Sequence, residues 1–155
     1  MIIDDFCATG SCRCGQVTLE VRSQPVMTSA CHCTGCQKMS GSAFSLTALF
    51  PADAFSITQG SPVIGGMHGP TRHYFCPHCL SWLFTRPEGN DDFVGVRSSL
   101  LDNPGRYAPF METWTREKLP WASTGAKVSY EAFPDPQDYP ALMAAFAAMA
   151  PGAES

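Results

Sequence analysis

Apolar and polar residues alternate in several short runs of the chain, and a period of two is typical of β-strands with one buried face. In the first run, Val17, Leu19 and Val21 alternate with polar residues. Thirteen glycines and thirteen prolines are spread along the chain, as expected of turns that connect many short strands. The predicted strands span residues 17–21, 44–50, 72–75, 82–85, 93–97 and 109–114. The third and fourth read as a hairpin, and the last as an edge strand.

A helix is predicted only near the end of the chain, over about residues 139–150. Asp138 is a candidate cap, and Leu142, Phe146 and Met149 share one face at i, i+4 and i+7. Because the segment has no basic face, it is expected to dock on a sheet rather than on a membrane. The 155 residues are therefore expected to form one mainly all-β domain, residues 1–155, with a core over about 10–134.

The charge and the composition of the chain limit the partners and the location that can be expected. The net charge is −4, the pI is about 5.4 and Lys and Arg are not clustered, so nucleic acid and anionic membranes are not expected as partners. The first residues lack the pattern of a signal peptide, and no apolar run reaches the ~20 residues that span a bilayer. We therefore expect a cytoplasmic location, in which thiols stay reduced. Charged residues make up only 15%, which leaves apolar surface for ligand binding or for pairing as a homodimer.

The cysteines carry the strongest chemical signal. Short spacings within a reduced chain favour metal binding over disulfides, because a Cys-x2-Cys turn curls the backbone around one ion. A thioredoxin-type pair would need a strand leading into a helix, whereas the residues after Cys79 read as strand. Cys7 lacks a partner at useful spacing and is expected to be a free thiol. Seven of the eight cysteines are predicted zinc ligands: Cys12, Cys14, Cys31, Cys33, Cys36, Cys76 and Cys79.

Seven ligands cannot fill two tetrahedra, so the simplest division is four and three. A four-thiolate site is closed and structural, whereas a three-ligand site keeps one position open to water or substrate. Spacing alone leaves the grouping open. Cys33 and Cys36 with Cys76 and Cys79 would also make an ordinary closed site.

The combined motifs resemble one family. They are Gly-x-Cys-x-Cys-Gly from Gly10, Cys-His-Cys-x2-Cys-Gln-Lys from Cys31, the following Ser40-Gly41, and Phe-Cys-x2-Cys from Phe75. This pattern is similar to the glutathione-dependent formaldehyde-activating enzyme family, or CENP-V/GFA domain, over about residues 10–84. The resemblance implies an Mss4-like fold of packed antiparallel sheets with zinc knuckles.

The resemblance also implies a grouping of ligands and a reaction. Cys12, Cys14, Cys76 and Cys79 would hold a structural zinc, and Cys31, Cys33 and Cys36 a second, catalytic-type zinc. Family members of known activity add the glutathione thiol to formaldehyde and form S-hydroxymethylglutathione. A zinc-dependent carbon–sulfur lyase, with glutathione as cosubstrate and a small thiol and a small aldehyde as substrates, is the leading hypothesis. A non-catalytic zinc-stabilised binding module and a cysteine redox sensor are the alternatives.

Further residues carry weaker expectations. His32 lies between two predicted ligands, either as a hydrogen-bonding support or proton shuttle, or simply pointing outward. Arg72 and Arg97 could meet glutathione carboxylates, but solvated arginines are the expectation. His78 is expected to face solvent and His68 to lie in a loop, while the three tryptophans are expected in a core or interface. Leu80 stands where the family usually has Gly, and a positive φ there would strain it.

Overall fold

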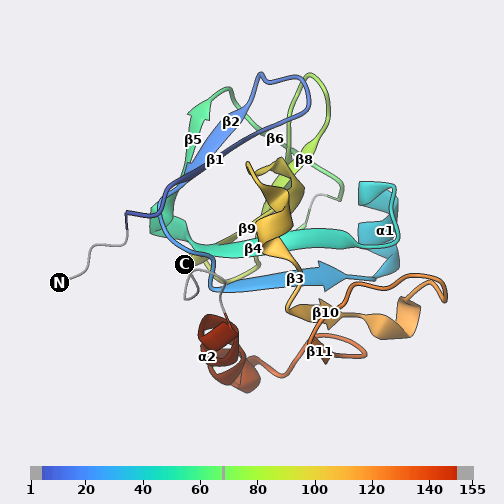
Figure 1. Ribbon diagram of the computed structural model, residues 1–155. Helices are drawn as coiled ribbons and strands as arrows, with labels where there is room; N and C mark the ends of the chain where they lie inside the picture. Colours follow the sequence, from blue (N-terminus) through green and yellow to red (C-terminus); the bar gives the residue numbers. More distant parts are fainter. Residues whose placement is uncertain (1–4, 68, 150–155) are drawn as a thin grey trace. The chain divides into compact units, whose positions relative to one another are not determined.

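The computed structural model describes residues 5–67 and 69–149 (Figure 1). The chain forms two compact units, one of Met1–Pro25 and Leu49–Pro104 and the other of Val26–Ala48 and Gly105–Ser155. Strand β4 (Ser45–Pro51) starts in the second unit and ends in the first. The prediction of a single domain stays a prediction.

The first unit consists of antiparallel strands. Strands β1 (Ala8–Ser11), β2 (Thr18–Val21) and β5 (Phe55–Gln59) form a three-stranded sheet in the order β1-β2-β5. The strands β6 (Val63–Gly65), β7 (Arg72–Phe75), β8 (Trp82–Arg86) and β9 (Phe93–Val96) pair in chain order. The predicted hairpin is therefore present, with Tyr74 opposite Phe84.

The alternating pattern correctly identified the core of this unit. Val17, Leu19 and Val21 are at most 1% exposed, and Leu83 is fully buried. Gly10 of β1 lets the chain approach closely, because a Cβ atom there would lie 2.7 Å from the carbonyl oxygen of Leu100. This contact leaves β1 against the turn of residues 98–101 and sets the start of the loop that follows β1.

The second unit contains strands β3 (Met27–Cys31), β10 (Met111–Thr113) and β11 (Val128–Ser129), and helices α1 (Thr34–Ser40) and α2 (Tyr139–Met149). Strand β10 lies between β3 and β11 and pairs in parallel with both. Helix α2 packs against β3 (Figure 1), and the ring of its Phe146 meets Phe110 edge-on at 5.7 Å between centroids. Short 3-10 turns complete the chain at Ala52–Ala54, Ser98–Leu100, Pro104–Tyr107, Thr115–Glu117 and Pro136–Asp138.

The mainly β fold with two sheets and a C-terminal helix is confirmed, and the arrangement is consistent with the Mss4-like fold. The strand pairs described in the first unit are antiparallel as expected, whereas β10 pairs in parallel with β3 and β11. Three details of the predicted elements were wrong. The strand around residue 111 is not at an edge, helix α1 was not foreseen, and Met149 is 55% exposed rather than buried with Leu142 and Phe146. The 3-10 turn Pro136–Asp138 leads directly into α2, and it is capped by Asp135, which accepts a hydrogen bond from the Gln137 N–H.

Within the part of the chain that the structure describes, every helix is too short or too polar to cross a membrane.

Candidate metal centres

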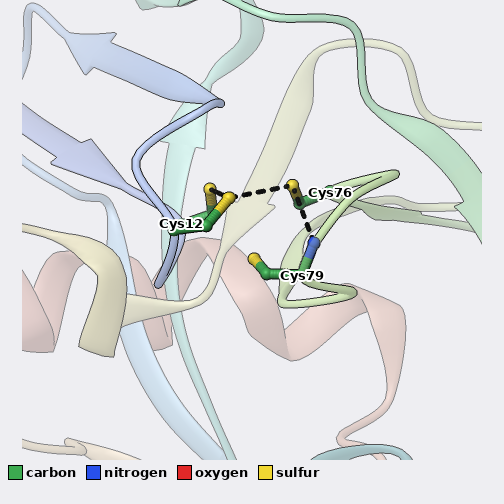
Figure 2. Close-up of side chains that lie close together, drawn as sticks. Cys12, Cys76 and Cys79 are labelled. Atoms are coloured by element: carbon green, nitrogen blue, oxygen red, sulfur yellow. Dashed lines mark hydrogen bonds between the residues drawn. The ribbon is translucent and has the colours of Figure 1, made fainter.

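Four cysteines from two loops of the first unit meet in one cluster, called here the four-cysteine cluster: Cys12, Cys14, Cys76 and Cys79. Figure 2 labels three of them, Cys12, Cys76 and Cys79. The four Sγ atoms all lie within 4.8 Å of one another. The Sγ of Cys14 lies 3.5 Å from that of Cys12 and 3.8 Å from that of Cys76. A tetrahedral zinc ion with Zn–S bonds of about 2.3 Å requires sulfur atoms about 3.8 Å apart. The cluster can therefore hold such an ion with little rearrangement.

The loop after β1 is shaped around the sulfur of Cys12. The Cys12 N–H donates to the carbonyl of Val17 at 3.0 Å, and the Val17 N–H donates to Cys12 Sγ at 3.3 Å. Gly15 closes the turn by donating to the Cys12 carbonyl, and its φ of +82° suits glycine. Backbone donation to sulfur favours the thiolate, which is the form that binds metal.

The hairpin loop between β7 and β8 repeats this arrangement around Cys76. The N–H groups of His78 and Cys79 point at Cys76 Sγ, at 3.4 and 3.5 Å. Leu80 closes the turn by donating to the Cys76 carbonyl at 3.0 Å. Its φ is +60°, so the strain expected for a leucine at this position is present. A hydrogen bond from the Ser81 hydroxyl is the main cause that lowers the pKa of Cys79 to about 5.

Three further cysteines form the three-cysteine cluster in the second unit. Cys31 ends β3, Cys33 is the N-cap of α1 and Cys36 lies in the first turn of that helix. Their Sγ atoms lie within 4.8 Å of one another, and the Cys36 N–H donates to Cys33 Sγ at 3.3 Å. A hydrogen bond from Cys36 is the main cause that lowers the pKa of Cys31 to about 5, while the same contact raises the pKa of Cys36.

The two clusters differ in completeness. Among the described residues, no other His, Cys, Asp or Glu side chain joins the three cysteines at ligand separation, including the neighbouring His32. A tetrahedral ion held here would keep one position for a ligand that is not protein. Soft thiolates in a tetrahedral arrangement suit zinc among the common divalent ions. The alternative grouping of Cys33 and Cys36 with the hairpin cysteines is not what the structure shows.

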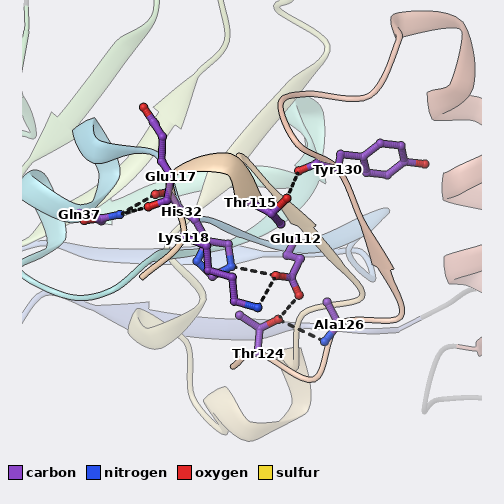
Figure 3. Close-up of polar contacts among 9 residues, drawn as sticks. All are labelled: His32, Gln37, Glu112, Thr115, Glu117, Lys118, Thr124, Ala126 and Tyr130. Atoms are coloured by element: carbon purple, nitrogen blue, oxygen red, sulfur yellow. Dashed lines mark hydrogen bonds and ion pairs between the residues drawn. The ribbon is translucent and has the colours of Figure 1, made fainter. Parts of the chain in front are cut away.

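His32, the residue between Cys31 and Cys33, belongs to a largely buried polar network (Figure 3). His32 is fully buried and its Nε2 lies 3.0 Å from Oε1 of Glu112 on β10. Lys118 donates to the same oxygen at 3.3 Å, and the hydroxyl of Thr124 donates to Oε2 at 2.8 Å. Burial raises the pKa of Glu112, but the hydrogen bonds from Thr124 and Lys118 and the positive charge of Lys118 outweigh it and hold this pKa below its ordinary value.

The structure also places the arginines and histidines that the sequence singled out. Arg97 was expected to be solvated, but it is 8% exposed and its guanidinium lies 4.0 Å from the centroid of the Trp82 ring. Arg72 is partly exposed and pairs with Asp91 at 3.4 Å. His78 is exposed, as expected, and His68 lies outside the described residues.

Cys7 is exposed and belongs to neither cluster. Trp82 belongs to the core, whereas Trp121 is 76% exposed and does not. Glu112 was missed by the sequence reasoning. Its one signal was an isolated acidic residue inside an apolar predicted strand, between Met111 and Thr113.

Several known proteins are similar to this chain. A protein of Penicillium rubens is 32% identical over 105 residues, which cover 63% of this chain and 55% of the relative. One of Emericella nidulans is 29% identical over 87 residues, covering 55% of this chain and 44% of the relative. Both carry provisional names as glutathione-dependent formaldehyde-activating enzymes. The chain thus spans about half the length of the curated relatives it matches.

A solved structure and a family model complete the comparison. The crystal structure of a Rhodobacter sphaeroides protein is similar in fold, with a TM-score of 0.51 and 17% sequence identity, over 79% of this chain and 98% of the other. The family model described as glutathione-dependent formaldehyde-activating enzyme matches residues 7–117, a range that contains both cysteine clusters and Glu112. The chain therefore belongs to the glutathione-dependent formaldehyde-activating enzyme family.

Proposed function

We propose that the protein is a zinc-dependent carbon–sulfur lyase that joins a small thiol to a small aldehyde, with glutathione and formaldehyde as the first pair to test. The observation that carries the proposal is the difference between the two clusters. One offers a complete set of four sulfur ligands, whereas the other offers three among the described residues. Four thiolates make a closed structural site, and three leave the open position that catalysis needs.

The four-cysteine cluster is assigned a structural zinc. Its ligands come from the loops that follow β1 and β7, which are more than sixty positions apart in the chain, so an ion there would tie distant segments together. Binding free energy at such a site contributes directly to folding, because the unfolded chain does not hold the ligands together.

The three-cysteine cluster is assigned the second zinc and the reaction. A zinc ion bound there would supply Lewis acidity, which lowers the pKa of a thiol or polarises a carbonyl. Cys31, Cys33 and Cys36 would hold the ion, and as three ligands they would leave a coordination position for substrate. In the reaction the thiol sulfur bonds to the aldehyde carbon, the carbonyl π pair moves to oxygen, and the proton lost by the thiol ends on that oxygen. Atoms and charge balance without a further reactant, and the cysteines need a reduced compartment such as the cytoplasm.

The test combines metal counting with a rate measurement. We expect two zinc ions per chain by elemental analysis, one of them removed readily by a chelator. The adduct forms without an enzyme, so catalysis is measured as faster exchange between free and adduct formaldehyde by carbon-13 NMR. Cys33→Ser should remove the labile zinc and the rate enhancement, while Cys7→Ser, at an exposed cysteine outside both clusters, should change neither.

Other outcomes favour the alternatives. Two zinc ions without any rate enhancement for several thiols and aldehydes would contradict the enzyme and favour a binding module. A single zinc, together with reversible loss of thiols in the three-cysteine cluster on treatment with peroxide, would favour a redox sensor.

A further inference from the structure

The residue between the first two cysteines of the three-cysteine cluster, His32, is held by contacts of both its ring and its backbone. His32 has no exposed surface, and its imidazole is fixed on one side by Glu112 at 3.0 Å. On another side the ring meets Phe44 edge-on, with 5.5 Å between centroids. A polar ring without access to water keeps its orientation only where its neighbours fix it.

The backbone of His32 is anchored as well as its ring. Its N–H donates to the carbonyl of Thr113 at 3.0 Å, which extends the parallel pairing of Cys31 with Thr113 by one residue. Its carbonyl accepts a hydrogen bond from the Gln37 side chain at 2.7 Å, and the same amide donates to the Glu117 carbonyl at 3.1 Å. The chain between two ligand sulfurs is thus fixed at its N–H, its carbonyl and its side chain.

Glu112 is committed to this role by its own contacts. Glu112 is 5% exposed, and both of its carboxylate oxygens accept hydrogen bonds. Oε1 accepts from His32 and Lys118, and Oε2 accepts from Thr124. A buried carboxylate without a counter-charge would be strongly unfavourable. Lys118 supplies that charge, so Glu112 adds little net negative charge beside the thiolates. The carboxylate therefore acts through geometry and not through its field.

We propose that His32 and Glu112 are positioning residues of the three-cysteine cluster, which hold Cys31 and Cys33 at ligand separation before metal binds. This inference rests on the proposed occupancy of that cluster by zinc. Hydrogen-bonded supports of metal ligands typically contribute 10–100-fold in metal affinity. Such supports usually accept a hydrogen bond from a histidine that is itself a metal ligand. Here the supported histidine is not a ligand but lies between two predicted ligands, Cys31 and Cys33.

The experiment measures metal at each cluster separately. Zinc release to a chromogenic chelator should follow two phases in the full-length protein, a fast one from the three-cysteine cluster and a slow one from the four-cysteine cluster. Glu112→Gln keeps the size of the side chain but replaces the charged acceptor of His32 with a neutral amide, which weakens the hydrogen bond that orients the ring. We expect its fast phase to quicken, and the affinity of that site to fall about 10–100-fold, with the slow phase unchanged. Asp91→Asn, at an exposed carboxylate of the other unit, is the matched control and should alter neither phase.

Glu112→Asp separates position from charge, because it keeps the carboxylate but retracts it from His32. A positioning role predicts that this variant binds metal as weakly as Glu112→Gln, and that the thiolate-to-cobalt absorption of the cobalt-loaded site shifts in both. If Glu112→Asp behaves like the unchanged protein, only the charge matters and the proposal is wrong. Should Glu112→Gln fail to fold, His32→Asn provides the same two-phase readout.

The outcomes also distinguish this inference from the proposed function. If the unchanged protein binds one zinc, the proposed function fails before the variants are compared. If it binds two, and both Glu112 variants release the labile zinc within twofold of its rate, the positioning role alone is overturned.

Discussion

Leu80 offers a direct test of how the hairpin loop of the four-cysteine cluster is built. Its φ of +60° places a leucine in the left-handed region, which is unfavourable by roughly 1–2 kcal/mol for a residue with a Cβ atom. The side chain is 67% exposed, so truncation removes only a modest amount of packing. Leu80→Ala and Leu80→Gly lose the same packing, but only glycine relieves the strain.

The comparison of these two variants isolates the strain. Glycine lowers stability by roughly 0.4–1 kcal/mol through the greater freedom of the unfolded chain. Subtracting this from the strain, at the midpoints of the two ranges, leaves Leu80→Gly about 0.8 kcal/mol more stable than Leu80→Ala. For a chain of this size that difference corresponds to roughly 1–4 °C in melting temperature. At an exposed position with a negative φ, the alanine variant would instead be the more stable of the two.

Urea unfolding of both variants, with zinc in excess, measures the difference. Zinc release from the four-cysteine cluster should slow in the glycine variant relative to the alanine variant for the same reason. If Leu80→Ala is as stable as Leu80→Gly, or more stable, then residue 80 does not hold the left-handed conformation and the described structure of the hairpin loop is wrong.

Three further predictions concern the two cysteine clusters, His73 and the packing of α2. Cys79→Ser should lower the melting temperature markedly because it removes one of the four ligands of the four-cysteine cluster, whereas Cys33→Ser should leave the melting temperature nearly unchanged. Equal decreases in melting temperature, followed by circular dichroism, would contradict this division. His73 has a pKa lowered from 6.5 by burial and by the charge of Arg97, so stability from its neutral form is complete above pH 6.5 and is lost as pH falls toward the folded-state value. His73→Gln should therefore lose less stability between pH 7.5 and 5.5 in urea unfolding, and an unchanged slope would refute the assignment. Phe146→Ala should lower the free energy of unfolding by about 3–5 kcal/mol, since the ring is 9% exposed; a loss below 1 kcal/mol would show that α2 is not firmly docked.

Strands with one buried face could be predicted, because their apolar and polar residues alternate along the sequence. Val17, Leu19 and Val21 follow this rule, and so do Ala48 and Phe50 of β4, which are fully buried. Helix α1 could not be predicted in this way. It is seven residues long and buries no side chain completely, so it leaves no apolar period in the sequence.

The parallel pairing of β10 with β3 could not be predicted from local sequence either. The residues of β10 carry no sign of which strand they will meet, and the partner β3 lies about eighty positions earlier in the chain. The contact between His32 and Glu112 depends on this pairing, so the ligating cysteines could be recognised from their spacing while the carboxylate beside them could not. Leu80 is an intermediate case, since its strain was foreseen from the glycine expected there and is borne out by its φ.

The central claim is that the two clusters bind zinc in different ways. Diffraction from crystals at the zinc absorption edge tests it most directly. The account predicts two anomalous peaks per chain, one surrounded by the four sulfur atoms of the four-cysteine cluster and the other by three sulfur atoms and one ligand that is not protein. A second peak completed by a side chain of the protein, or no second peak with a disulfide between Cys33 and Cys36, would contradict it.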